Sequence, residues 1–223
     1  MSCMDYTRQM DLVPIEALRQ FDLDVIGAGG IGSWTVVALA KLGVGSIRVF
    51  DDDVVEPLNL PSQCYSLSHA RAGIPKVEAL RELCREFSDS EIEPVCERVE
   101  HQQLRLTVIS ALDSMKSRRQ VWEGAIKGRP IDRYLDSRMG GHSLTILTVR
   151  PTSPVEKSVY EETLYADDEA LPLPCTARAV VSWPLVAAAL LVRQIVAIAG
   201  GDEPAHRIDA YLGANPFIVE ESD

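Results

Sequence analysis

The sequence is short of basic residues for its size. Of its 223 residues, 22 are Lys or Arg and 33 are Asp or Glu, so the formal net charge is −11 at pH 7. A protein that coats nucleic acid needs a surplus of positive charge to neutralise phosphates, so this balance argues against a nucleic-acid partner. A local cationic pocket remains compatible with it.

Paired cysteines and a leader-like start are also missing. The five cysteines are odd in number and no two form a C-x-x-C pair, so we expect reduced thiols in a cytoplasmic protein and no disulfide framework. No apolar run follows a basic start, so we expect no signal peptide. The most apolar stretch, residues 179–199, is interrupted by Ser182, Pro184, Arg193 and Gln194. It is predicted to be a buried helix and not a membrane span.

The chain alternates between strand-like and helix-like segments as far as residue 149. Strands are predicted at 23–26, 46–50, 92–95, 106–110, 131–135 and 143–149. Helices are predicted at 14–20, 33–42, 75–87 and 115–126. Alternation of this kind predicts an α/β fold with a doubly wound, mostly parallel, Rossmann-like sheet and helices on both faces.

A glycine-rich turn, Gly27-Ala-Gly29-Gly30-Ile-Gly32, lies between the first predicted strand and the next helix. Glycines let the backbone come close to a ligand, and free N–H groups at a helix start face an anion. The turn therefore predicts a phosphate or nucleotide cradle. Asp51 ends the following strand, where an acidic side chain can hydrogen-bond ribose hydroxyls. The same turn and acid are also a dinucleotide fingerprint, which leaves NAD open.

The segments around this turn help to identify which nucleotide it binds. In order come Arg8-Gln9, the glycine turn, Asp51-x-Asp53-x-Val55, Asn59-Leu60-Pro61-Ser62-Gln63, Gly73-x-Pro75-Lys76 and Asp113-Ser114. This series resembles the ThiF/MoeB/HesA family, the prokaryotic relatives of ubiquitin-activating enzymes. The motifs occur in the family's order and at suitable spacing, and together they are far more specific than any one of them.

The resemblance implies an ATP-dependent adenylyltransferase. In the family a carboxylate attacks the α-phosphate of ATP bound with magnesium, which gives an acyl-adenylate and releases pyrophosphate. The typical carboxylate is the C-terminal glycine of a small ubiquitin-like or sulfur-carrier protein. Because these groups concentrate negative charge, positioning and cations must do most of the catalysis. An NAD-binding oxidoreductase and a non-catalytic nucleotide-binding or assembly protein stay open as alternatives.

The resemblance assigns nucleotide binding to nine residues: Gly27, Gly29, Gly30, Gly32, Asp51, Asp53, Asn59, Gln63 and Lys76. Asp51 matches the residue that holds the ribose, while Asn59 and Lys76 match residues that face the phosphates. Their structural alternatives are turn residues for Asp51 and Asn59, and a surface side chain for Lys76. Pro75 suits a first helical turn, which places Lys76 at the positive end of a helix, where a bound phosphate would offset the repulsion.

The resemblance assigns catalysis to Asp113, Lys76, Arg8 and Cys175. Asp113 would bind magnesium or orient the attacking carboxylate; its alternative is a helix cap. Arg8 would cross a two-fold interface to the γ-phosphate of a partner's ATP, which implies a homodimer; its alternative is a surface charge. Cys175 would accept the acyl group as a thioester or persulfide; its alternative is a small core residue.

The chain departs from the family pattern in three places. The arginine of the N-L-x-R-Q motif is Ser62, so one phosphate-binding cation is missing, for which Arg71 is a candidate replacement. The D-N pair is Asp113-Ser114. The two zinc-binding C-x-x-C pairs of many members are absent, so we expect no structural zinc.

The chain is expected to form one adenylation domain over residues 1–223. Its parts are a nucleotide-binding core at 1–149, a crossover loop at 150–176, and an apolar helix with closing strands at 177–223. Residues 151–176 contain four prolines and an acidic run, and are predicted to be irregular and to cover the bound carboxyl tail. Residues 207–219 are predicted to form one or two strands.

Overall fold

A single sheet organises the part of the chain that the computed structural model describes, residues 4–88, 90–165, 180–213 and 218–222. Its strand order is β3-β2-β1-β4-β5-β6-β7-β8. The first five strands pair in parallel, and β6, β7 and β8 extend the sheet antiparallel from β5. The strands are β1 (Asp22–Ile26), β2 (Ser46–Phe50), β3 (Ile92–Val95), β4 (Thr107–Ser110), β5 (Arg133–Gly140), β6 (Ser143–Val149), β7 (Arg207–Tyr211) and β8 (Ile218–Ser222).

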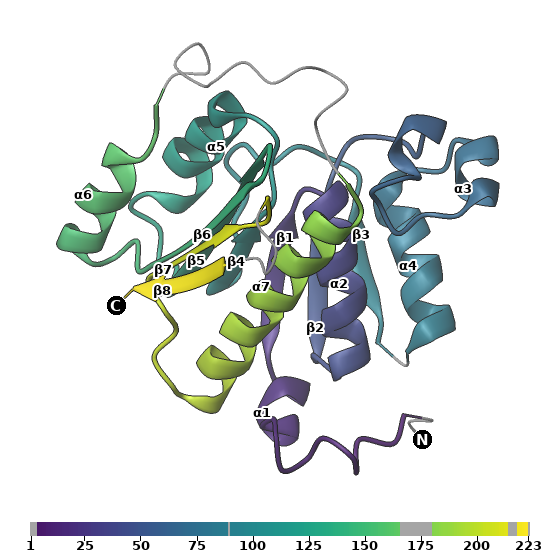
Figure 1. The fold of residues 1–223 in the computed structure, drawn as a ribbon, viewed down its shortest axis with the longest axis horizontal. Helices are drawn as coiled ribbons and strands as arrows, with labels where there is room; N and C mark the ends of the chain where they lie inside the picture. The colour runs from purple at the N-terminus through teal and green to yellow at the C-terminus, as the bar shows by residue number, and fades with distance from the viewer. Residues whose placement is uncertain (1–3, 89, 166–179, 214–217, 223) are drawn as a thin grey trace.

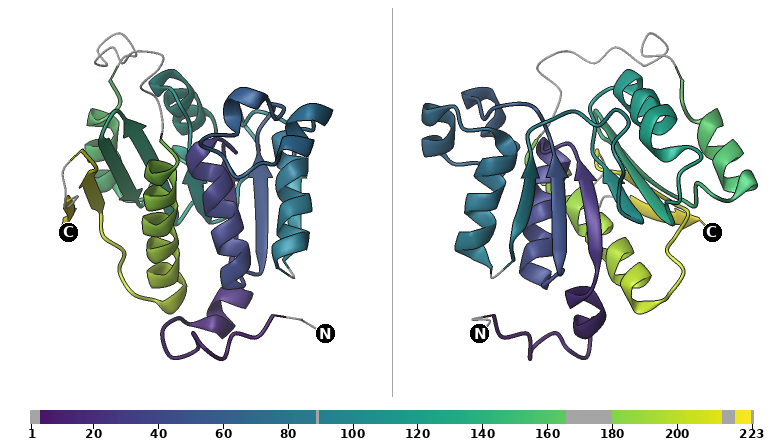
Figure 2. Two further views of the ribbon diagram at one scale, coloured as in Figure 1. Left: turned by 45° about the vertical axis from the view of Figure 1, so that its right-hand side comes forward. Right: turned by 180° about the vertical axis from the view of Figure 1, so that it is seen from behind.

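Helices cover both faces of this sheet (Figures 1 and 2). One face carries α2, α4 and α7, and the other carries α5 and α6, so the predicted doubly wound α/β fold is confirmed. The helices are α1 (Ile15–Arg19), α2 (Gly30–Leu42), α3 (Leu67–Ala72), α4 (Lys76–Phe87), α5 (Met115–Val121), α6 (Pro154–Glu162) and α7 (Ser182–Gly200). A 3-10 turn at Pro57–Asn59 and a π-helical turn at Trp122–Ile126 complete the described elements.

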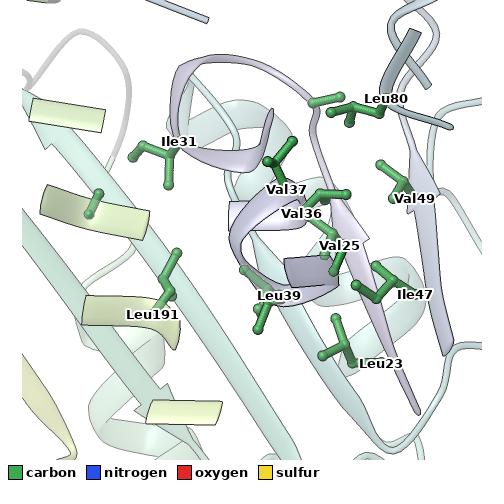
Figure 3. Close-up of a cluster of buried hydrophobic side chains, with 14 of the residues drawn as sticks. Leu23, Val25, Ile31, Val36, Val37, Leu39, Ile47, Val49, Leu80 and Leu191 are labelled. Carbon is green, nitrogen blue, oxygen red and sulfur yellow. The ribbon is translucent and has the colours of Figure 1, made fainter. Parts of the chain in front are cut away.

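The larger core lies between the sheet and α2, α4 and α7 (Figure 3). Alternate residues of a strand face the same side, so Leu23 and Val25 of β1 align with Ile47 and Val49 of β2. Leu39 of α2 belongs to the same fully buried cluster. Burying each such side chain contributes about 1.5–3 kcal/mol. This packing holds the start of α2 at the carboxyl ends of the strands.

The prediction of an irregular stretch over residues 151–176 is wrong for Pro154–Glu162, which form α6. Ser153 caps this helix, because its hydroxyl accepts the N–H of Glu156 at 3.4 Å, and Pro154 occupies the first helical turn. The four prolines of this stretch led to the prediction of irregular backbone. Pro154, however, occupies the first turn of a helix, where proline is favoured. The predicted closing strands are confirmed as β7 and β8.

The predicted apolar helix is α7, and one of its faces is buried against α2 and the sheet. Ala187, Leu191 and Ile195 on this face have no exposed surface. By length and composition α7 could also cross a membrane, and only 33% of its most apolar window is buried. The prediction of a buried helix is therefore confirmed for one face alone.

Candidate functional site

The glycine turn connects β1 to α2 at the point where the strand order reverses between β1 and β4. Open α/β sheets bind ligands beyond the strand ends at such a switch point. Gly27 has a φ of +93°, and a Cβ there would lie 2.6 Å from the Ala111 carbonyl oxygen. A Cβ on Gly32 would lie 1.9 Å from the Gly27 carbonyl oxygen. The fold itself therefore requires glycine at 27 and 32.

Gly29 has a different environment from these two glycines. A Cβ placed on Gly29 would meet no atom of the described residues within 4 Å, so the turn borders open space in that part of the chain. Gly29 is also the N-cap of α2, and the first N–H groups of a helix have no partner within the helix. Open space beside unpaired amides, at the positive end of a 13-residue helix, fits a phosphate group.

Asp51 supports the turn from the end of β2. Its Oδ2 accepts the Ala28 N–H at 2.7 Å, and its Oδ1 accepts the Asp53 N–H at 2.9 Å. Burial raises the pKa of the Asp51 carboxyl, while the Ala28 amide and the Lys76 ammonium act in the opposite direction. The expected turn role of Asp51 is therefore present, and each carboxylate oxygen keeps a further lone pair for a ligand.

Lys76 is the first residue of α4 and is buried, so the surface alternative is wrong. Its Nζ lies 2.6 Å from Asp53 Oδ2 and 3.8 Å from Asp51 Oδ1. The carboxylates of Asp51, Asp52 and Asp53 all lie within 4.8 Å of one another. The Lys76 ammonium provides the cation beside this cluster, although it costs free energy at a helix start. The structure thus brings three motif residues, Asp51, Asp53 and Lys76, together with the glycine turn.

Asn59 and Gln63 lie in the segment between β2 and α3. Asn59 ends the 3-10 turn, and its Oδ1 accepts the Glu56 N–H at 2.8 Å, so its turn role is present. The Oε1 atom of Gln63 is buried and has no hydrogen-bond partner among the described residues. Buried polar groups are normally paired, so Gln63 Oε1 is an unsatisfied acceptor next to Ser62 and the glycine-turn helix.

Two aromatic residues that the sequence analysis did not identify connect the segment between β2 and α3 to the glycine turn and α2 through hydrogen bonds. Tyr65 donates its hydroxyl to the Ala28 carbonyl at 2.6 Å, and it is buried. Trp34 donates its indole N–H to the Ser62 carbonyl at 3.1 Å. The Ser62 backbone, at the position of the missing family arginine, thus lies next to α2. No local pattern signals these contacts, because the partners are 28 and 37 residues apart.

Asp113 follows β4 and is exposed near the glycine turn. Ala111, two residues before Asp113, lies against Gly27 and donates its N–H to the Ile26 carbonyl at 2.8 Å. Ser114 and not Asp113 caps α5, because the Ser114 hydroxyl accepts the Ser117 N–H at 3.1 Å. Asp113 itself makes no hydrogen bond or ion pair to another described residue.

Two predicted site residues remain, Arg8 and Cys175, and the described structure places neither of them beside the glycine turn. Arg8 is exposed in the N-terminal segment, where neighbouring Tyr6 lies against Gly43 at the far end of α2. Since a helix rises 1.5 Å per residue, this end lies about 20 Å from the glycine turn. Arg8 makes no hydrogen bond or ion pair to another residue in the described ranges. Cys175 lies outside the described residues.

Comparison with known proteins identifies the family of this chain. Residues 6–217 match the ThiF family. The chain belongs to the ThiF family. Over 155 residues it is 31% identical to molybdopterin-synthase adenylyltransferase of Salmonella typhimurium, which covers 66% of this chain and 61% of that protein. Over 84 residues it is 40% identical to tRNA threonylcarbamoyladenosine dehydratase 2 of Saccharomyces cerevisiae, covering 37% of this chain and 19% of that one.

Solved structures share the fold of this ThiF-family chain. The crystal structure of PaaA superposes with a TM-score of 0.73 at 19% identity, covering 98% of this chain and 68% of that chain. The ThiF-family chain spans less than two thirds of the length of either curated relative. Those relatives carry different named activities, so the activity of this chain is argued from its site.

Proposed function

We propose that this ThiF-family protein is an ATP-dependent adenylyltransferase. It activates a carboxylate, the C-terminal glycine of a ubiquitin-like or sulfur-carrier protein, as an acyl-adenylate and releases pyrophosphate. The observation that carries the proposal is the open space at Gly29, bordered by the first amides of α2, with Lys76 buried near the same turn. A triphosphate needs this combination of backbone donors and a fixed cation more than a redox coenzyme does.

Each of the described site residues would have a separate role in binding ATP. When bound, ATP with Mg²⁺ supplies an electrophilic α-phosphorus and the leaving pyrophosphate. The amides at Gly29 and Gly30 would bind phosphate oxygens, and Asp51 would bind the ribose. Lys76 would neutralise phosphate charge. Because Ser62 replaces the family arginine, Lys76 carries a larger share of that neutralisation.

Asp113 would hold the magnesium ion or orient the attacking carboxylate. Its exposed side chain has no competing partner among the described residues, and it follows the strand next to the turn. Asp53, Asn59 and Gln63 would complete the nucleotide site, with the Gln63 amide as its unpaired polar group. The Cys175 thiolate would attack the carbonyl carbon of the acyl-adenylate, which forms a thioester and releases AMP.

Arg8 would act on the nucleotide of a second copy in a homodimer. The position of the N-terminal segment supports this assignment, because neighbouring Tyr6 lies against Gly43, at the end of α2 remote from the glycine turn. The site would then be composite, with the cradle from one chain and a cation from the other.

The decisive experiment measures exchange of labelled pyrophosphate into ATP, with a ubiquitin-like protein ending in Gly-Gly as the probe. We expect exchange by the wild type and none by Asp113→Asn, whose ATP affinity stays within about threefold by calorimetry, since positioning and binding are separable. Asp52→Asn is the matched control, because Asp52 is an exposed neighbouring carboxylate that pairs with Arg98 at 2.8 Å.

Other results would favour the alternatives. Normal exchange by Asp113→Asn would remove its catalytic role. Calorimetric binding of NAD without binding of ATP and magnesium would support an oxidoreductase. Binding of ATP without exchange, whatever carrier is added, would support a non-catalytic nucleotide-binding protein.

A further inference from the structure

Arg98 lies at the edge of the sheet that carries the glycine turn. The strands β1, β2 and β3 are parallel, so their carboxyl ends share this edge (Figure 2). Val95 ends β3, and its carbonyl accepts the Asp51 N–H at 3.2 Å and the Glu97 N–H at 2.9 Å. Arg98 follows directly, and its own carbonyl accepts Gln102 Nε2 at 2.8 Å. The backbone thus fixes Arg98 beside the end of β2.

The Arg98 side chain contacts the aspartates that follow β2. We name Asp51, Asp52 and Asp53 the aspartate triplet. Arg98 Nε donates to Asp52 Oδ2 at 2.8 Å, and the three carboxylates of the triplet lie within 4.8 Å of one another. Asp51 Oδ2 in turn accepts the Ala28 N–H of the glycine turn. Two carboxylates therefore connect the Arg98 guanidinium to the glycine turn.

The guanidinium also responds to the strand on the other side of the turn. The hydrogen bond from Asp52 raises the pKa of Arg98, and the charges of Asp53 and Asp113 add smaller contributions in the same direction. Asp113 follows β4, which pairs with β1 on the side opposite β2. Carboxylates on both sides of the glycine turn therefore attract this one cation.

The ion pair between Arg98 and Asp52 is exposed to solvent. The Arg98 side chain is 75% exposed and the Asp52 side chain 41%. Exposed ion pairs contribute little to stability, because water and salt screen them, so this guanidinium can exchange one anion for another. A phosphate group is the stronger partner, since it accepts two parallel hydrogen bonds from the guanidinium fork.

A triphosphate at the glycine turn would need a second cation. It would meet the three carboxylates of the triplet, and the Lys76 ammonium already pairs with two of them. Ser62 stands where the family pattern has an arginine. Arg98 is a further cation attached to the triplet, and it comes from a different strand end than Lys76 does.

We propose that Arg98 releases Asp52 and binds phosphate oxygens of the nucleotide, which supplies the positive charge missing at Ser62. The inference rests on the nucleotide binding of the proposed function, and not on transfer of AMP to a carboxylate. Asp52 holds the guanidinium beside the triplet before the nucleotide binds, so the side chain has only a short way to move.

Calorimetry with ATP and Mg²⁺ tests this role through two variants that break the same ion pair. Arg98→Ala should lose at least about tenfold in ATP affinity, because a hydrogen bond to a charged group is lost. Asp52→Asn should bind ATP as tightly as the wild type or more tightly, because it removes only a carboxylate. Both unfolding temperatures should stay within about 4 °C of the wild type. Equal losses of affinity in the two variants would overturn the proposal.

Two further measurements identify the part of the nucleotide that Arg98 contacts. Arg98→Lys keeps the charge but not the guanidinium fork, so it should recover only part of the ATP affinity. Adenosine carries no phosphate, and its affinity should change less than about twofold in Arg98→Ala. A loss for adenosine as large as the loss for ATP would place Arg98 against the base or the ribose and would overturn the proposal.

Two other arginines provide comparisons. Arg129 is exposed and precedes the amino end of β5, at the opposite edge of the sheet, so Arg129→Ala should keep wild-type ATP affinity. Arg71 is the candidate that the sequence offered for the missing cation. A loss of ATP affinity in Arg71→Ala, together with wild-type affinity in Arg98→Ala, would assign the cation to Arg71 and overturn the proposal.

The remaining outcomes separate this inference from the proposed function. A wild type that binds ATP and loses it in Arg98→Ala, but shows no pyrophosphate exchange with any carrier, supports the role of Arg98 and defeats the adenylation. Wild-type ATP affinity and exchange in Arg98→Ala defeat the role of Arg98 and leave the adenylation standing. A wild type that binds no ATP would overturn both.

Discussion

At the residue scale, the glycine turn separates positions that the fold needs from positions that a ligand needs. Gly32→Ala would press a Cβ against the Gly27 carbonyl and should cost stability at the upper end of about 1–3 kcal/mol. Gly29→Ala meets open space at a φ of −78°, so it should cost about 1 kcal/mol or less. Its methyl group would instead enter the space proposed for phosphate, and ATP affinity should fall about tenfold, or 1.4 kcal/mol.

Thermal unfolding and calorimetry of both variants check this contrast. Wild-type ATP affinity in Gly29→Ala would show that the nucleotide does not use this space. A Gly32→Ala protein as stable as Gly29→Ala would contradict the packing assigned to the turn.

The thiols should differ in reactivity because they differ in burial. Desolvation raises the pKa of Cys64 and of Cys84 to about 12, whereas Cys96 is exposed. The thiolate is the reactive form, so iodoacetamide at pH 8 should modify Cys96 well before the other two. Peptide mass spectrometry of native and urea-unfolded protein measures this order, and equal labelling in the native state would contradict it.

The same two thiols make stability depend on alkaline pH. In the unfolded chain they ionise near 9.0, while in the folded chain they stay protonated, so the folded state binds more protons. Their contribution is present below pH 9 and is lost as the pH rises toward 12. A Cys84→Ala variant should show a smaller fall in unfolding free energy over this range than the wild type does, as measured by urea titration.

At the element scale, one buried carboxylate joins α5, β5 and α6. Asp136 Oδ1 accepts Arg118 Nε at 3.0 Å, while Oδ2 accepts Arg138 Nε at 2.7 Å and the Tyr160 hydroxyl at 3.0 Å. Arg118 also donates to the Leu112 carbonyl, directly before Asp113. The hydrogen bonds of Asp136 and Arg118 thus set the position of the loop that carries Asp113, the proposed magnesium ligand.

Asp136→Asn should therefore destabilise the protein strongly. Removing one partner of a buried ion pair costs about 3–5 kcal/mol, because the remaining charges stay desolvated. Asp52→Asn, which breaks the exposed pair with Arg98, should cost far less. Urea denaturation of the two variants checks the difference, and similar midpoints would show that Asp136 has little structural role.

At the scale of the whole molecule, net charge governs the proposed assembly. The Debye length falls from about 30 Å at 0.01 M salt to about 8 Å at 0.15 M, which screens the repulsion between two acidic copies. Pairing of two acidic copies, as the role proposed for Arg8 requires, should therefore tighten as salt rises over this range. Sedimentation equilibrium at both salt concentrations measures the dimer dissociation constant, and weakening with salt would indicate an interface held by ion pairs.

Local patterns in the chain were sufficient for the fold class and for the members of the central site. β1, β2 and α2 follow from short apolar runs around a glycine turn, whose constraints act between residues close in sequence. Asp51, Asp53 and Lys76 were predicted to share a nucleotide site from the resemblance of their motifs to those of the ThiF/MoeB/HesA family. Their hydrogen bonds and ion pairs agree with that prediction.

Contacts between distant segments account for the features that no local pattern revealed. Tyr65 donates its hydroxyl to the Ala28 carbonyl, 37 residues away, and packing against α2 buries only one face of α7. These outcomes depend on which surfaces meet in three dimensions, and burial, unlike turn chemistry, is a property of the assembled chain.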